Sequence, residues 1–128
     1  MSVSATMEVK NYVTGEVEEE LYADSKVIPA NTKDPVKVAD GKIEDGYEGI
    51  AVSLACTQNA NVCAFLKIAG KQVYPNGLNT AGLGGLSEET LLLVKIEEGK
   101  SWELGFNNTG TTDVTVAFRF RIRKFRKK

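Results

Sequence analysis

The chain has 128 residues, 42% of them hydrophobic and 26% charged, which is typical of one globular domain with its own core. It contains no histidine, which removes the commonest general base and metal ligand, and its two cysteines cannot build an ordinary zinc site. No apolar run approaches the ~20 residues of a membrane helix and the first ten residues do not resemble a signal peptide, so we expect synthesis inside a cell and no membrane partner.

The net charge of −1 is distributed unevenly along the chain. Residues 119–128 carry seven basic and no acidic side chains, which leaves −8 for all the other residues together. The acidic side chains gather mainly in residues 16–24 and 40–48. A body of this charge repels polyphosphate except near the C-terminus, so nucleic acid is not the partner we expect.

Apolar and polar residues alternate with a period of two over residues 7–13 and again over 17–24, and this pattern predicts β-strands. In the second run, the side chains predicted to face inward are Val17, Leu21 and Ala23. Those predicted to face outward are Glu18, Glu20, Tyr22 and Asp24. Two prolines and an asparagine then predict a loop over residues 28–35, followed by a short strand at 36–38.

The next two predicted strands cover residues 50–56 and 62–70. In the first, the predicted inward side chains are Ile50, Val52, Leu54 and Cys56. A four-residue turn at 58–61 would place Cys56 directly opposite Cys63, within reach of a disulfide. The alternative is two free thiols that pack as small hydrophobic side chains, since nothing indicates an oxidising compartment.

Residues 75–89 form a glycine-rich connection, and residues 90–106 read as a β-hairpin with its tip at Glu98-Gly99. In that register Lys95 faces Trp102, and an oppositely charged pair flanks the tip. One face of the hairpin would then be a core patch made of Leu91, Leu93, Trp102, Leu104 and Phe106.

The final predicted strand runs from Val114 to Ile122, and its inward face is entirely apolar. We therefore assign residues 1–123 to a single β-sandwich domain and residues 124–128 to a short basic end. Arginines alternate on the outward face of this strand, about 7 Å apart, and such a row requires acidic partners. The partners could be the acidic run at 18–20, another subunit or phosphates. The candidate partner-binding residues are Arg119, Arg121, Arg123, Lys124 and Arg126.

No stretch of the chain carries a catalytic signature. The sequence GLGGLSEET lacks the Gly-Lys-Ser/Thr of a phosphate loop, and no carboxylate pair is placed across a recognisable cleft. We therefore expect no enzymatic activity, no cofactor and no bound metal.

Strand lengths and turn spacing predict an all-β fold, an antiparallel sandwich of about eight strands. The segments GIAVSLAC, CAFLKIAGKQVYP and LLLVKIEEGKSWELGFNNTGTTDVTVAFRFRI resemble in their rhythm the small jelly-roll proteins of virions, including capsid decoration and tail-attached proteins of tailed viruses. The resemblance implies a jelly roll that binds a capsid or tail protein, assembles as a homo-oligomer such as a trimer, and resides in the virion after synthesis in the host cytoplasm.

Two other functions remain open. A carbohydrate-binding β-sandwich would need exposed aromatic side chains, for which the candidates are Tyr12, Tyr22, Tyr47 and Tyr74. A nucleic-acid-associated protein would act through the basic residues 119–128.

Overall fold

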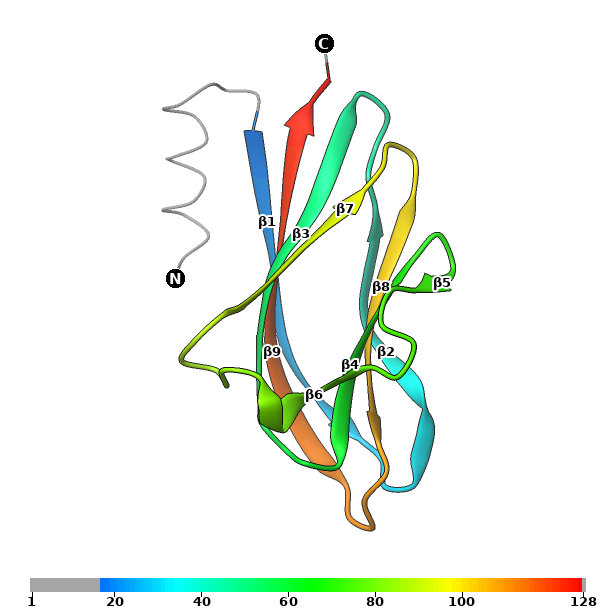
Figure 1. Cartoon of the computed structure of the whole chain (residues 1–128), viewed down its shortest axis with the longest axis vertical. Helices are drawn as coiled ribbons and strands as arrows, with labels where there is room; N and C mark the ends of the chain where they lie inside the picture. Colours follow the sequence, from blue (N-terminus) through cyan, green and yellow to red (C-terminus); the bar gives the residue numbers. More distant parts are fainter. Residues whose placement is uncertain (1–16, 128) are drawn as a thin grey trace.

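The computed structural model describes residues 17–127, which form a sandwich of two antiparallel β-sheets (Figure 1). This confirms the predicted all-β sandwich. The predicted strand at 7–13 lies outside the described residues. Within them, the one helical segment is a single 3₁₀ turn, η1 (Thr80–Gly82).

Each sheet is built from strands that are far apart in the sequence. Sheet A has the order β1-β9-β3-β7, made of β1 (Val17–Ile28), β9 (Val114–Arg126), β3 (Tyr47–Cys56) and β7 (Thr90–Ile96). Sheet B has the order β2-β8-β4-β5, made of β2 (Thr32–Lys42), β8 (Ser101–Asn108), β4 (Val62–Ile68) and β5 (Lys71–Gln72). A further short strand, β6 (Leu78–Asn79), also pairs with β4.

The core lies between the sheets and is richest where β8 faces β9. The ring centroids of Trp102 and Phe120 are 5.2 Å apart, and those of Phe106 and Phe118 are 6.0 Å apart. All four side chains are buried. The alternating apolar face predicted for the last strand is therefore confirmed.

The predicted hairpin over residues 90–106 is wrong. Its two strands lie in different sheets, because β7 pairs with β3 whereas β8 pairs with β2 and β4. Consequently Leu91 and Leu93 do not join the core patch of Trp102 but are exposed by 67% and 62%. The side chains of β7 that pack on the core are Leu92, Val94 and Ile96.

The inward and outward sides predicted for residues 17–24 are also reversed. Directly paired residues share one face of a sheet, and Tyr22 is opposite Phe120 whereas Leu21 is opposite Arg121. Tyr22 therefore points inward, where its ring lies 4.9 Å from that of Trp102.

A register shift between Ala51 and Ser53 interrupts the alternation of β3, so the residues before the shift point to the opposite side from the predicted one. The residues of β3 that enter the core are Ala51, Leu54 and Cys56. Of the predicted inward set, Ile50 and Val52 are only half-buried and are not part of that core.

In place of the loop predicted over residues 28–35, the structure has a tight turn at residues 29–31, because β1 extends to Ile28 and β2 begins at Thr32. Pro35 is accommodated within β2, which is an edge strand whose register shifts between Thr32 and Val36. A proline lacks the N–H that a central strand would need, and an edge strand with a bulge does not require it.

The two cysteines do not face each other across a hairpin. Cys56 is opposite Phe118 in sheet A, Cys63 is opposite Asn107 in sheet B, and both thiols are free. The turn at 57–61 therefore crosses between the sheets, and the predicted opposition of the cysteines is wrong.

Thiol labelling will check this arrangement. Burial raises the pKa of the Cys56 thiol to about 11, and it also raises the pKa of the half-buried Cys63. Only an accessible cysteine in its thiolate form reacts with Ellman's reagent. At pH 8 the reagent should therefore modify Cys63 first and Cys56 only after unfolding. If the protein, denatured without a reducing agent, contained no reactive thiol, the two cysteines would instead form a disulfide.

Candidate partner-binding surface

The basic residues near the C-terminus belong to β9, which runs to Arg126 between β1 and β3. The predicted boundary between a domain ending at residue 123 and a free basic end is therefore wrong. Lys124 and Phe125 pair with both neighbouring strands, and Arg126 pairs with Tyr47 of β3. The backbone N–H of Lys127 donates to the carbonyl of Gly46 at 2.7 Å.

Glu19 lies on the outer face of sheet A, on the edge strand β1, where its carboxylate sits between two arginines of β9. Its carboxylate accepts from Arg121 Nη1 at 2.8 Å and from Arg123 Nη2 at 2.7 Å. The Glu19 side chain is only 6% exposed. Glu19 is directly opposite Arg123 in the β1–β9 register, so the pairing of these strands places the charges together.

A second carboxylate, that of Glu89, binds the other side of Arg121. Arg121 donates from Nη2 to Glu89 Oε2 at 3.0 Å and from Nε to Oε1 at 3.1 Å, which is a bidentate contact. The hydroxyl of Ser53 on β3 also donates to Glu89. Arg119 completes the row by donating to the backbone carbonyl of Leu86.

These contacts determine the charge state of both acids. Burial alone would raise the pKa of Glu19, but hydrogen bonds and charge from Arg121 and Arg123 outweigh it and lower the pKa. The hydrogen bonds of Arg121 and Ser53 lower the pKa of Glu89. The outer face therefore keeps a compact ladder of ionised, mutually paired groups at neutral pH.

Acid titration will test the contribution of this ladder. A lowered folded-state pKa contributes stability that is present above the unfolded pKa and is lost as the pH falls through the folded one. Glu19→Gln should therefore reduce the free energy of unfolding by about 2 kcal/mol at pH 7 and by much less at pH 3. Urea unfolding at both pH values measures the difference, with the exposed Asp34→Asn on β2 as control. An equal loss at both pH values would contradict an ionic role for Glu19.

Lys124 points to the opposite face from the arginine row, at the end of the sandwich. Its side chain is 5% exposed, and its ammonium contacts three carboxylates. The Nζ–Oε distances are 3.0 Å to Glu20, 2.5 Å to Glu44 and 3.9 Å to Glu18. Burial alone would lower the pKa of Lys124, but the acidic partners outweigh it and raise the pKa.

Tyr47 lies against two of the predicted basic residues. Lys124 Nζ is 5.4 Å from the centroid of its ring, and the guanidinium carbon of Arg126 is 5.2 Å from the same centroid. Arg126 also donates to the Tyr47 hydroxyl at 3.0 Å. Each predicted partner-binding residue therefore has a contact inside the fold, while Arg123 and Arg126 remain exposed to solvent.

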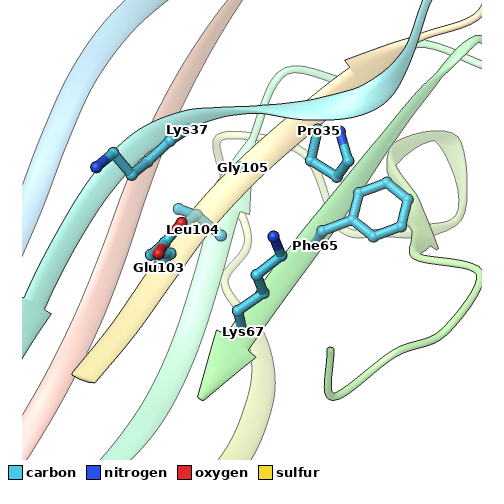
Figure 2. Close-up of a pocket in the computed structure, with 7 residues that line it drawn as sticks. All are labelled: Pro35, Lys37, Phe65, Lys67, Glu103, Leu104 and Gly105. Atoms are coloured by element: carbon cyan, nitrogen blue, oxygen red, sulfur yellow. The ribbon is translucent and has the colours of Figure 1, made fainter. Parts of the chain in front are cut away.

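The outer face of sheet B contains a small pocket, shown in Figure 2. Its lining residues are Pro35, Lys37, Phe65, Lys67, Glu103, Leu104 and Gly105. The cavity volume of about 20 Å³ is enough for about one water molecule and far below that of a small-molecule site.

Sequence reasoning missed an apolar edge on sheet A. The large hydrophobic side chains exposed among residues 17–127 are Val27, Leu86, Leu91 and Leu93. The predicted core position of Leu91 and Leu93 conflicts with the charged Lys95, which follows on the same face. The even-numbered row of Leu92, Val94 and Ile96 is uninterrupted by charge, and that signal could have identified the inward face.

Within residues 17–127, no group of three or more acidic, cysteine or histidine side chains is arranged to hold a metal ion. No helix in the described part of the chain is long and apolar enough to cross a membrane. No protein-family model matches the chain, and no curated protein matches it.

Proposed function

We propose that this protein is a non-enzymatic structural component of a virion, a capsid decoration or cementing protein that binds a capsid or tail surface. The observation that carries the proposal is the strand order, β1-β9-β3-β7 facing β2-β8-β4-β5. The long strands alternate between the two sheets along the chain, which supports jelly-roll connectivity, an architecture used by viral capsid proteins and also by lectins and cupins.

The mechanism we propose is adhesion by a rigid surface. The ion pairs from Glu19 and Glu89 hold Arg121 and Arg123 in place, so the arginine row is ordered before any partner arrives. A preordered surface loses little conformational entropy on binding. The exposed cation Arg123 would then meet acidic groups of the capsid or tail protein, and Arg126, on the Lys124 side of β9, would meet them at the end of the sandwich.

Co-sedimentation will test the proposal. Particles purified from the virus that carries the gene should contain the protein at a fixed ratio to the major capsid protein. Recombinant protein should rebind to particles lacking it, and Arg123→Ala with Arg126→Ala should weaken rebinding, whereas Lys71→Ala on the exposed β5 should not. Absence from the particles would refute the proposal. A glycan-array signal lost on Tyr74→Ala would favour the carbohydrate-binding alternative.

A further inference from the structure

The free edge of sheet A is unusually apolar. β7 is the last strand of this sheet, and within residues 17–127 it pairs only with β3. Its other edge therefore presents backbone donors and acceptors alongside Leu91 and Leu93, which are exposed by 67% and 62%. Natural edge strands are normally protected by charges, prolines or cover, so an apolar edge indicates association with another strand.

Leu93 also has a strained backbone. Its φ is 53°, in the left-handed region where a non-glycine residue is destabilised by its Cβ. The position lies in a bulge, since β7 has one more residue than β3 between the pairs Ala51–Val94 and Ser53–Leu91. Glycine or asparagine would relieve the strain, and strained non-glycine residues of this kind cluster at functional sites.

The outward residues of this edge are complementary to themselves. We define the β7 edge row as Leu91, Leu93 and Lys95, which Glu89 immediately precedes at the start of β7. When a second copy is placed antiparallel with the two-fold axis at Leu92, Leu91 of each copy faces Leu93 of the other. In the same register the position of Glu89 faces Lys95, also twice, and the Glu89 carboxylate, although bound by Arg121 and Ser53, is still 36% exposed. All four cross-strand pairs are therefore favourable, with apolar contacts at the centre and opposite charges at the ends.

Neighbouring registers lose this match. Moving the axis to Leu91 or Leu93 places a leucine opposite a charged residue, and the axis at Leu93 also places Glu89 opposite the acidic Glu97. Lys95 is available for the contact, because its side chain is 60% exposed and its contact with Glu48 is 3.9 Å long. Exposed charge pairs of this kind fix orientation more than they add affinity.

We propose that the protein forms a two-fold symmetric dimer in which β7 of one copy lies antiparallel to β7 of a second copy, joining their A sheets. Such an interface is isologous, with the same row contributed by both chains. The inference goes beyond the proposed function, because it concerns a second copy and holds whatever larger partner the protein has.

Light scattering coupled to size exclusion will test the dimer. At about 100 µM, a concentration that reveals weak interfaces, the protein should have twice the chain mass of 13.9 kDa. Leu93→Lys should give the single mass. The matched control is Val27→Lys, which changes an equally exposed apolar residue on β1, the other edge strand of sheet A, and should remain dimeric. A monomeric wild type, or equal dissociation of both variants, would overturn the proposal.

Two further experiments test the register and the strain. Leu91→Cys mixed with Leu93→Cys, both in a Cys63→Ser background, should form a cross-linked dimer on mild oxidation, whereas each variant alone should form much less. Leu93→Asn should raise the melting temperature at low protein concentration while lowering the dimer fraction, because asparagine tolerates this φ. Equal cross-linking in all three samples, or a stabilised variant that dimerises normally, would exclude this interface.

Discussion

Trp102→Ala is expected to lower the free energy of unfolding by about 3–5 kcal/mol, a large share of the stability of a domain of this size. The indole is 1% exposed and packs between Tyr22 and Phe120, at ring-centroid distances of 4.9 and 5.2 Å. It also covers Gly41 so closely that a Cβ there would lie 2.8 Å from the ring. Alanine would leave a cavity that two sheets held by their hydrogen bonds cannot close.

Urea unfolding followed by circular dichroism measures this loss. Val27→Ala is the control, because the Val27 side chain is exposed and its removal should change the free energy by no more than about 0.5 kcal/mol. If Trp102→Ala were as mild as the control, the indole could not be a central core residue. A mild effect combined with lost sugar binding would support the carbohydrate-binding alternative.

Deletion of Lys124–Lys128 should destabilise the domain by at least about 3 kcal/mol. It removes the last paired residues of β9, which hydrogen-bond to β1 on one side and to β3 on the other. It also leaves the carboxylates of Glu18, Glu20 and Glu44 without their shared cation. If residues 124–128 were a free basic end, as the sequence predicts, their deletion would leave the free energy of unfolding unchanged.

The matched control is deletion of Lys127 and Lys128 alone, which keeps Lys124 and the paired end of the strand. It should cost much less, because the pair between Lys127 and Glu98 is exposed to solvent. Lys124→Met then separates charge from chain length, since it keeps the strand and removes only the ammonium. Equal stability of the full chain and the longer deletion would contradict the ordered strand end.

The sequence predicted the strands better than it predicted their neighbours. Alternation over residues 114–122 identified both the strand and its inward face, because Phe118 and Phe120 leave no doubt about which side is buried. In residues 17–24 both faces hold apolar side chains, so period two alone could not decide between Leu21 and Tyr22. Tertiary pairing decided it by placing Tyr22 opposite Phe120.

Loop length misled the prediction of pairing. The connections at 57–61 and 97–100 are short enough for hairpins, yet each carries the chain from one sheet to the other. A short turn fixes only that two strands are near each other, not that they are hydrogen-bonded. The pairing errors for Cys56 with Cys63 and for Lys95 with Trp102 share this cause.

The sequence predicted which basic residues make up the candidate surface, but not which side chains they contact. The arginine row and its need for acidic partners followed from alternation and charge. The acidic run at 18–20 was among the predicted partners and supplies Glu19. Glu89 was not predicted, because it lies in a glycine-rich connection far from β9 in sequence. Which acid reaches Arg121 depends on how that connection folds back over sheet A, and sequence periodicity contains no information on it.

The pairing of β1 with β9 has a consequence for synthesis on the ribosome. These two strands form a continuous ladder from Val17–Phe125 to Ile28–Val114, although they stand at opposite ends of the described chain. At 5–20 residues per second, β1 emerges roughly 5–20 s before its partner has been made. During that interval the hydrogen-bonding edge of β1 stays open to other chains, and sheet A cannot be completed until β9 has left the ribosome.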